Sequence, residues 1–595
     1  MGVISNRILI SNLYTKKEKS ILLLSALLQV VASILDLFGV VLIGLIGSVA
    51  TLGISAQQPG GLTARLLEIM QIENLSLQGQ VAAIGALAAL VLIGKTLFSI
   101  LIMRRTIFYL ANRSAMILSR VINKSLSMNY QNFKKYSRAD LIHSFTNGIN
   151  TISMGIVAQG LTLVSDISLL LILGIGLFIA EPILAGITLI FFSSIGFMLY
   201  LLLNVRARRL GEESTEIYRN TARRIEDLVG AYRELTVKNL KGNIASEIKA
   251  KSLRNSQIIG EFSFMPYISK YTIEIGMILG VLGISAVQFS RDSVSGAVAT
   301  ISVFLVASFR IGPAILRIQS ITVGIKRALG QSKPTLHLLH ELQTVETKIP
   351  EITKFNSNHS GFKSNIEIKE LDFSYEEKFI FRGVSLAISQ GEHIALIGNS
   401  GEGKTTLVDL ICGNLKPSKG QVRISGLTPE EAMLKWPGAL AYVPQNVYVT
   451  AGSIRSNLTL GYEGFGREIS EEILLECMKQ AELYEFVREK GGLDFELLED
   501  GRNISGGQVQ RLGLARALVS NPQLVILDEA TSALDANTQR EIGITLSKLR
   551  GKCTIIMIAH RASSIRHCDR IFEVSMNSIH DVTELERRKI GVNLE

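Results

Sequence analysis

The nine residues from Gly398 to Thr406 combine residue types and spacing that suit phosphate chemistry. The apolar run 393–397 before them is short and β-branched enough for a buried strand, and the residues after them have the apolar spacing of a helix. A strand, a glycine-rich turn and a helix carrying Gly-x4-Gly-Lys-Thr are typical of a phosphate-binding loop. Glycines let backbone N–H groups converge on phosphate oxygens, and the helix N-terminus adds favourable partial charge. The sequence therefore predicts binding of a nucleoside triphosphate.

Two side chains of this loop have predicted roles beyond backbone contact. Lys404 would reach the β- and γ-phosphates, and the Thr405 hydroxyl would ligate Mg²⁺. ATP and Mg²⁺ are accordingly the predicted cofactors. The candidate nucleotide-binding residues of the loop are Gly398, Asn399, Ser400, Gly401, Glu402, Gly403, Lys404, Thr405 and Thr406.

In a second motif, a run of four aliphatic residues, 524–527, is followed directly by Asp528 and Glu529. Such a run predicts a strand of a parallel sheet, and ligands bind at the C-terminal ends of these strands. Asp528 would hold Mg²⁺ through water, and Glu529 would orient or deprotonate the attacking water. Another buried run, 554–559, ends in His560. A lone histidine is usually a satisfied core residue, but this strand end would place it beside Glu529 and the γ-phosphate.

The composition indicates a membrane protein. Of 595 residues 47% are hydrophobic and 19% charged, and the apolar excess lies in the first 320 or so residues. The net charge of +10 could suggest nucleic-acid binding, but the basic residues concentrate between the apolar runs, as the positive-inside rule describes. The chain has four cysteines, at no metal-ligand spacing, which read as free thiols in a reducing cytosol.

The apolar half contains six stretches long enough to cross a bilayer. They are Ile21–Val49, Val81–Met103, Ile156–Ala180, Ile183–Val205, Tyr267–Phe289 and Val294–Ile318. The joints after the second and the fourth stretch are strongly basic, which predicts that these joints and both termini face the cytoplasm. We expect a multi-pass protein of the bacterial inner (plasma) membrane, with both termini and the nucleotide-binding part cytoplasmic.

The two basic joints are long and carry amphipathic helical spacing without turn clusters, so we expect cytoplasmic helix extensions that turn back in a short helix. The coupling turns would lie near Ser137–His143 and Leu228–Val237. On the far side, Thr51–Gln80 could form a helix in the membrane interface or an ordinary capping helix. The predicted domains are a transmembrane domain at 1–329, a linker at 330–365 and a nucleotide-binding α/β domain at 366–595, with a helical insertion near 460–500.

The stretch Ile504-Ser505-Gly506-Gly507-Gln508-Val509-Gln510-Arg511 is a second glycine turn that opens a helix. It matches the signature sequence of ATP-binding-cassette (ABC) proteins, although Ile504 stands where leucine is usual. Other family motifs follow the same order along the chain. Tyr375 matches the aromatic that stacks on adenine, Gln445 the glutamine loop, Ser532–Asp535 the D-loop, and His560 the switch histidine. Glu499–Gly501 resembles a loop specific to exporters.

Six spans followed by one cassette resemble an ABC exporter half-transporter, with a six-helix membrane bundle and an α/β P-loop NTPase cassette. The resemblance implies that Ser505, Gly506, Gly507 and Gln508 of one cassette close over ATP at Lys404 of another. A second copy, forming a homodimer, is therefore the implied partner, with a degenerate partner as the alternative. The resemblance also implies nucleotide contact by Asp535 and places Gln445 at Mg²⁺ and in catalysis, beside Glu529 and His560.

Ionisable residues within the spans give weaker information about the cargo. The candidates for a substrate-binding cavity are Lys95, Lys270, Arg310 and Arg317. Together they could line the bundle with positive charge suited to a phosphate or pyrophosphate head group. Alternatively, Asp36, Asp166 and Glu274 could pair with them, Lys270 with Glu274 in particular, and Lys95 could extend to the interface.

This charge pattern and the far-side segment resemble the lipid-linked oligosaccharide flippases of the exporter class, although lysine cannot make the bidentate contact of arginine. The Ser137–Ile142 stretch also resembles that group. We expect an ATP hydrolase that moves a lipid-linked oligosaccharide or another lipid-like amphiphile. A peptide or drug exporter and a channel or regulator of the same class are the alternatives, whereas a soluble cassette ATPase would need no spans.

Overall fold

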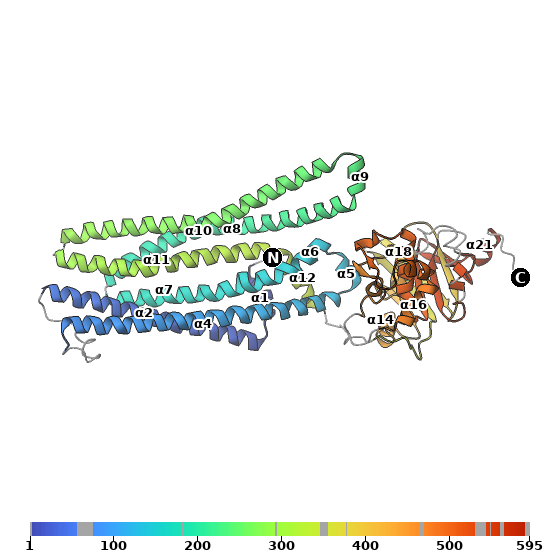
Figure 1. Ribbon diagram of the computed structural model, residues 1–595, viewed down its shortest axis with the longest axis horizontal. Helices are drawn as coiled ribbons and strands as arrows, with labels where there is room; N and C mark the ends of the chain where they lie inside the picture. The colour runs from blue at the N-terminus through green and yellow to red at the C-terminus, as the bar shows by residue number, and fades with distance from the viewer. Residues whose placement is uncertain are drawn as a thin grey trace. The chain divides into compact units, whose positions relative to one another are not determined.

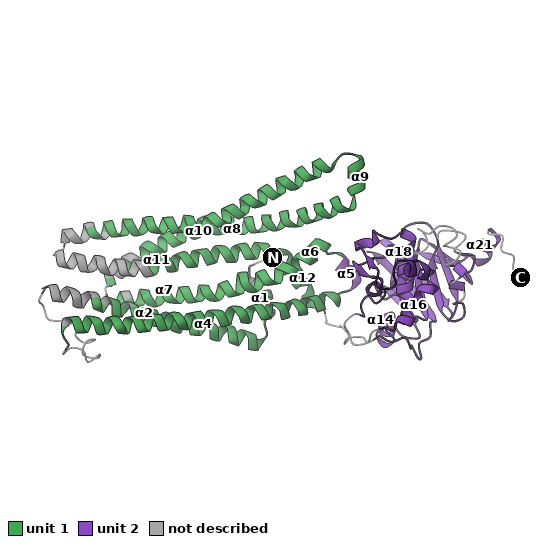
Figure 2. Ribbon diagram, viewed as in Figure 1, with its two compact units in different colours: residues 1–128, 135–347 green, residues 129–134, 348–595 purple. Residues whose placement is uncertain are grey.

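The structure, a computed structural model, describes residues 3–55, 75–180, 182–291, 294–345, 355–375, 378–462, 469–529, 543–544, 546–547, 549–559 and 565–589. The chain divides into two compact units (Figure 2). The helical unit comprises Met1–Met128 and Lys135–Thr347, and the cassette unit comprises Asn129–Lys134 and Lys348–Glu595.

The helical unit consists of long helices joined by short ones (Figure 1). Its α-helices are α1 (Val3–Asn12), α2 (Lys16–Ser55), α4 (Leu77–Leu126), α6 (Arg138–His143), α7 (Gln159–Ala180), α8 (Pro182–Gly230), α9 (Tyr232–Val237), α10 (Lys241–Arg291), α11 (Val294–Gln331) and α12 (Lys333–Glu341). Two π-helical segments, η1 (Ser144–Gly148) and η2 (Thr151–Ala158), precede α7, and a 3₁₀ turn, η3 (Leu342–Thr344), follows α12. In this unit α2 packs on α4, and α11 packs on α8.

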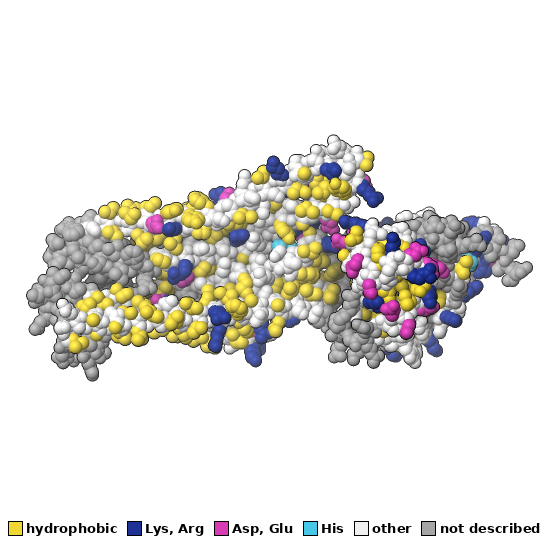
Figure 3. Space-filling model, viewed as in Figure 1, with side chains coloured by type: hydrophobic (Ala, Val, Ile, Leu, Met, Phe, Trp, Pro, Cys, Tyr) yellow, Lys and Arg dark blue, Asp and Glu magenta, His cyan; other side chains and the backbone are white. Residues whose placement is uncertain are grey.

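Four of the described helices are long and apolar enough to cross a membrane, judged by length and composition. The windows are Lys16–Ile43, Gln78–Leu126, Thr151–Gly176 and Leu189–Gly230. The remaining two predicted spans lie in α10 and α11, so the count of six stays a prediction. On the face drawn in Figure 3, hydrophobic side chains cover much of the surface of the long helices. Leu90 and Leu97 of α4 are among the exposed large hydrophobic residues of this unit. Apolar surface of this extent needs lipid or another chain to cover it.

The two basic joints are helical. Between α4 and α7 the chain turns through α5 (Tyr130–Lys134) and α6, and between α8 and α10 it turns through α9. The predicted turn at Ser137–His143 corresponds to α6 in the helical unit, yet the segment that groups with the cassette unit is the one before it, Asn129–Lys134. The π-helical stretch after α6 was not anticipated, because helical periodicity in a sequence does not distinguish the two helix types. Of the far-side segment Thr51–Gln80, residues 56–74 lie outside the described part of the chain.

Helices α8 and α11 approach each other closely through glycine. A Cβ atom at Gly211 would lie 2.7 Å from the carbonyl oxygen of Arg327, and one at Gly330 would lie 2.8 Å from that of Arg208. Any larger side chain would force the two backbones apart. The backbones of α8 and α11 are therefore in close contact at these two glycines.

The cassette unit has an α/β core. Its strands are β1 (Ile366–Tyr375), β2 (Lys378–Ile388), β3 (His393–Ile397), β4 (Lys419–Ile424), β5 (Leu440–Val443), β6 (Gly452–Ser453), β7 (Glu496–Leu497), β8 (Leu524–Asp528), β9 (Thr554–Ile558), β10 (Arg570–Ser575) and β11 (Ser578–Asp581). Its helical elements are α13 (Lys404–Ile411), α14 (Pro429–Lys435), α15 (Ile454–Leu458), α16 (Glu471–Gln480), α17 (Tyr484–Glu489), η4 (Glu499–Gly501), α18 (Gly506–Leu518) and α21 (Thr583–Lys589).

The main sheet has the order β11-β10-β3-β9-β8-β5, and all neighbours except β10 and β11 are parallel. Strands β8 and β9 are buried at every position, as expected for parallel strands covered on both faces. A second sheet, β2-β1-β4, is antiparallel. This arrangement confirms the predicted α/β domain and brings the C-terminal ends of β5, β8 and β3 to one edge of the main sheet.

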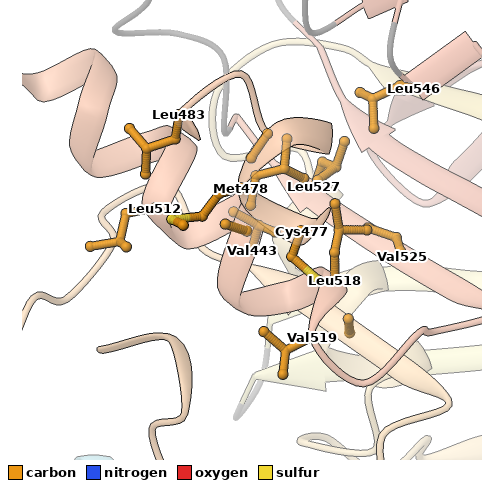
Figure 4. Packing of buried hydrophobic residues seen from close by; sticks show 14 of the residues in the cluster. Val443, Cys477, Met478, Leu483, Leu512, Leu518, Val519, Val525, Leu527 and Leu546 are labelled. Atoms are coloured by element: carbon orange, nitrogen blue, oxygen red, sulfur yellow. The ribbon is translucent and has the colours of Figure 1, made fainter. Parts of the chain in front are cut away.

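One hydrophobic cluster joins the sheet to the helical insertion predicted near 460–500 (Figure 4). Met478 of α16 and Leu512 of α18 pack in the same cluster as Val443 of β5 and Leu527 of β8. This packing holds the helix that carries the signature sequence against the strands that carry the carboxylates.

The predicted linker at 330–365 is shorter in the structure. Its first part forms the end of α11 and α12, whose Leu338 is buried in the helical unit. Its last part belongs to the cassette unit, where Phe362 packs against Trp436. Residues 346–354, between these parts, lie outside the described residues.

Candidate nucleotide and substrate sites

The phosphate loop follows β3 and leads into α13. Gly398, Gly401 and Gly403 have φ angles of 136°, 86° and 109°, which L side chains rarely adopt. At Gly403 there is no room for a side chain either, because a Cβ would lie 2.7 Å from Cγ2 of Ile380 and 3.0 Å from Cζ of Phe381. The loop therefore needs glycine for conformation at these positions, and for space at Gly403 and at Gly398, where a Cβ would meet the carbonyl oxygen of Val574.

Lys404 is buried, and its ammonium is turned onto its own loop. Its Nζ donates hydrogen bonds of 2.8 Å to the carbonyl oxygens of Gly398 and Asn399. Burial lowers the pKa of Lys404, while the nearby Glu529 and Glu402 oppose that shift. Neutral carbonyls cannot compensate a buried positive charge as an anion would. The ammonium is thus held at the loop by weak partners that a phosphate group would replace.

The loop is also fixed by Glu402. Its carboxylate accepts hydrogen bonds from the backbone N–H of Asn399 at 2.7 Å and from the Asn399 side-chain amide at 2.9 Å. Near these hydrogen bonds, Ser400 and Thr405 are exposed and Thr406 is buried. The hydroxyl of Thr405 therefore remains accessible at the first turn of α13.

The two carboxylates at the end of β8 are held by side chains from β5 and the loop after it. The Tyr442 hydroxyl donates a hydrogen bond of 2.9 Å to Oδ2 of Asp528. The Gln445 amide donates one of 2.7 Å to Oε2 of Glu529. Gln445, Asp528 and Glu529 thus lie together as the sequence suggested. Tyr442 was missed because a tyrosine within a strand carries no motif signal.

Asp528 is distinguished by its shifted pKa, and Glu529 by its backbone conformation. Burial raises the pKa of Asp528, while the Tyr442 hydrogen bond and the charge of Lys404 oppose that shift. Glu529 has φ 48°, a left-handed conformation that costs free energy in a residue with a side chain. Strained backbone of this kind is concentrated at functional sites.

The signature sequence begins at an exposed helix end. Ser505 is the N-cap of α18: its hydroxyl accepts from the Gln508 N–H at 3.2 Å, and the Gln508 side chain accepts from the Ser505 N–H at 2.8 Å. Ser505 and Gly506 are exposed, and Gly507 is half-buried. This capping box fixes the helix end and leaves it facing outward.

Three further predicted nucleotide residues have different outcomes. Tyr375, at the end of β1, is 42% exposed and packs edge-on against Phe373 with ring centroids 5.0 Å apart. Asp535 and His560 lie outside the described residues, so their placement stays a prediction. The four cysteines are free and buried. Burial raises the pKa of the Cys553 thiol to about 12.

Two of the candidate cations of the membrane part form ion pairs between helices. Lys95 of α4 pairs with Asp36 of α2. Arg317 of α11 pairs with Asp166 of α7, with Nη2 2.9 Å from Oδ1. These are the pairings that the sequence left open, and each joins two helices that pack on each other.

The remaining two candidates differ. Lys270 pairs with Glu274 on its own helix α10, at 3.8 Å, and both side chains are close to half exposed. The backbone of Arg310 lies in α11, but its side chain is outside the described part of the structure. The described side chains therefore form separate neutral pairs and not one cluster of like charge.

Comparisons with known proteins agree with these two units. A family model described as "ABC transporter" matches residues 381–532. The "ATP-dependent lipid A-core flippase" of Francisella tularensis subsp. holarctica (strain OSU18) is 28% identical over 458 residues, which is 74% of this chain and 72% of that protein. The "Uncharacterized ABC transporter ATP-binding protein YwjA" of Bacillus subtilis (strain 168) is 38% identical over 225 residues, 37% of this chain and 38% of that protein.

A solved structure shares the fold along nearly the whole chain. The "Structure of a bacterial Atm1-family ABC exporter with ATP bound" covers 96% of this chain and 95% of its own, with a TM-score of 0.71 and 18% sequence identity. The matched cassette implies ATP binding, and the exporter fold places apolar helices before it. The chain therefore carries an ABC transporter ATP-binding domain on an exporter-type fold; it is similar to ABC exporter half-transporters, including lipid flippases, and this similarity supports ATP hydrolysis coupled to transport.

Proposed function

We propose that two copies of this chain form an ATP-driven flippase of the bacterial inner membrane, with a lipid-linked oligosaccharide or a similar anionic lipid as cargo. The lipid A-core flippases among the relatives support a lipid cargo. Charge inside apolar helices supports an anionic head group, because ionisable residues are costly there and usually serve function.

The observation that carries the cargo proposal is the pair formed by Arg317 and Asp166. The Asp166 side chain is 8% exposed, whereas that of Arg317 is 50% exposed. The arginine thus keeps N–H groups available beyond those that bind the aspartate. A guanidinium can bind phosphate oxygens in a bidentate manner, which favours a phosphate or pyrophosphate head group. Lys95 would act as a second, less directional cation, released from Asp36 when the cargo binds.

The nucleotide site supplies the driving force in this proposal. The backbone of residues 398–403 and the Lys404 ammonium would bind the phosphates, and Tyr375 would stack on the base. Oxygen donors suit Mg²⁺, and the exposed Thr405 hydroxyl, the Gln445 side-chain oxygen and the Asp528 carboxylate offer them. When bound, Mg²⁺ supplies charge neutralisation between the phosphates. Glu529, with His560, would orient and deprotonate the attacking water.

The Gln445 amide donates a hydrogen bond to the Glu529 carboxylate. While this hydrogen bond is formed, Oε2 of Glu529 is occupied and cannot contact a water molecule directly. Movement of Gln445 toward the metal site would release Glu529 for this role. Hydrolysis would therefore depend on a rearranged loop after β5.

The outward-facing end of α18 supports the dimer. Ser505 and Gly506 are exposed at a helix N-terminus, which favours an anion.

The tip between α8 and α10 also has apolar surface that needs cover, with Val237 87% and Tyr232 54% exposed. In the proposed homodimer, α18 of one copy binds nucleotide at Lys404 of the other, and the α9 tip carries closure to the helices.

The test is reconstitution in proteoliposomes with a fluorescent polyprenyl-pyrophosphate glycan, measuring lipid movement and ATP hydrolysis together. We expect Arg317→Ala, made together with Asp166→Asn so that no buried carboxylate loses its partner, to abolish lipid-stimulated hydrolysis while basal hydrolysis stays within about twofold of the unaltered protein. The matched control is Arg206→Ala, which removes an exposed arginine paired with Glu261 at 2.9 Å. Equal stimulation of the double variant and unaltered protein would contradict the cargo proposal, as would stimulation by a hydrophobic peptide or drug alone.

A further inference from the structure

Tyr442 lies in β5, the strand next to β8 at the edge of the main sheet. The two strands are parallel, and Tyr442 is opposite Ile526 in their register. Side chains alternate along a strand, so Ile526 and Asp528 point to the same face of the sheet. Tyr442 points to that face as well, which is why its hydroxyl reaches Oδ2 of Asp528 at 2.9 Å.

The surroundings of Asp528 explain why a neutral donor suits this place. Asp528 is buried, with a relative exposure of 7%. Glu529 and Asp409 are near enough to repel its charge, and Lys404, the cation nearby, is bound to loop carbonyls. An arginine or lysine at position 442 would form a salt bridge and compete with a metal ion. A tyrosine hydroxyl satisfies one carboxylate oxygen without adding positive charge.

We propose that Tyr442 is a positioning residue, which binds Oδ2 of Asp528 and so fixes the orientation of the carboxylate that would hold magnesium. The proposal rests on the nucleotide site proposed above. It assigns Tyr442 no contact with nucleotide, water or metal. The same strand thereby orients one carboxylate through Tyr442, and the loop after it restrains the other through Gln445.

The hydroxyl, and not the ring, is the working group in this proposal. Tyr442→Phe removes the hydroxyl and keeps the ring, whereas Tyr442→Ala removes both. Tyr448→Phe is the matched control, because Tyr448 lies in the loop after β5 and is 49% exposed. All three variants are made in the full-length protein.

The experiment measures divalent-metal binding directly, without turnover. Mn²⁺ is titrated into detergent-solubilised protein with a non-hydrolysable ATP analogue, and bound Mn²⁺ is read from its electron paramagnetic resonance signal. We expect Tyr442→Phe to weaken Mn²⁺ binding about three- to tenfold, the usual net contribution of one intramolecular hydrogen bond. Nucleotide affinity in EDTA should stay within about twofold, and Tyr448→Phe should match the unaltered protein in both measurements.

Two outcomes would overturn the inference. If Tyr442→Phe binds Mn²⁺ as the unaltered protein does while Tyr442→Ala is impaired, the ring matters and the hydroxyl does not. If Tyr442→Phe loses nucleotide affinity equally in EDTA, the effect is a general disturbance of the sheet. A separate result, no effect of Mn²⁺ on nucleotide binding in the unaltered protein, would instead refute the proposed metal site.

Discussion

The charged side chains of the candidate sites have different kinds of partner in the two units. In the helical unit, Lys95 meets Asp36 and Arg317 meets Asp166, so each buried carboxylate has a cation on a neighbouring helix. In the cassette unit, Asp528 and Glu529 are held by a tyrosine and a glutamine, and Lys404 by backbone carbonyls. The first arrangement neutralises charge within the fold. The second leaves charge available for a ligand.

The difference has a physical reason. A charge among apolar helices has little water to solvate it, so an unpaired one costs several kcal/mol. At the edge of the parallel sheet Asp528 and Lys404 are buried as well, but their partners are neutral hydrogen-bonding groups, and the backbone strain of Glu529 is offset by the surrounding core. A nucleotide site also gains from weak partners, because phosphate and metal then have less to displace. Three variants test this contrast, from the largest expected effect to the smallest.

The first variant, Glu529→Gln, removes the proposed base while keeping a side chain that can bond to Gln445. We expect ATP hydrolysis to fall by about 10²–10⁴-fold, the usual range for losing a general base. Nucleotide affinity should be kept, and the dimer should persist after ATP is added. Steady-state hydrolysis and size-exclusion chromatography with ATP check both points. Hydrolysis within a few-fold of the unaltered protein would remove Glu529 from the mechanism.

The second variant, Asp36→Asn, leaves Lys95 unpaired among apolar helices. The Lys95 side chain is 21% exposed and that of Asp36 6%, so we expect a loss of about 3–5 kcal/mol in unfolding free energy. Denaturant titration in detergent, followed by far-UV circular dichroism of the helices, measures this loss of unfolding free energy.

Two further variants sharpen this result. Adding Lys95→Gln to Asp36→Asn should recover most of the loss, because no buried charge remains. Glu274→Gln breaks the exposed pair on α10 and should cost no more than about 0.5 kcal/mol. Equal losses for Asp36→Asn and Glu274→Gln would show that burial does not set the value of these pairs.

The third variant, Gly403→Ala, tests how tightly the phosphate loop is built. Its φ of 109° and the contact with Ile380 both oppose a side chain, so we expect a cost of about 1–3 kcal/mol, read as weaker ATP binding. Gly401→Ala is the control: φ is 86°, but nothing lies within 4 Å of its Cβ position. Isothermal titration of ATP should show the larger loss for Gly403→Ala, and the reverse order would contradict this account of the loop.

Much of the cassette could be predicted from the sequence because its chemistry is local. The phosphate loop needs a strand, a turn and a helix that are contiguous from His393 to Ile411, and Asp528 and Glu529 follow directly on a buried strand. Their places in the structure agree with that expectation. The helical joints were also predictable, since amphipathic periodicity does not depend on distant residues.

The sequence limited the possible acidic partners of the membrane cations, but it did not determine which acid pairs with which cation. The sequence offered Asp36, Asp166 and Glu274 as partners, and only the Lys270–Glu274 pair follows from helical spacing alone. Lys95 and Asp36 are 59 positions apart (95 − 36), so their contact depends on how α2 packs on α4. The same holds for the α8–α11 approach at Gly211.

By itself the sequence determined the phosphate loop, the two carboxylates after a buried strand, the signature turn and the apolar stretches, because each is encoded within one continuous segment. The tertiary structure decided that Tyr442 meets Asp528, that Gln445 binds Glu529, and which acids neutralise Lys95 and Arg317. These contacts join residues far apart in the chain. Their geometry is set by strand register and helix packing, which bury apolar surface over whole elements and leave individual polar partners to follow.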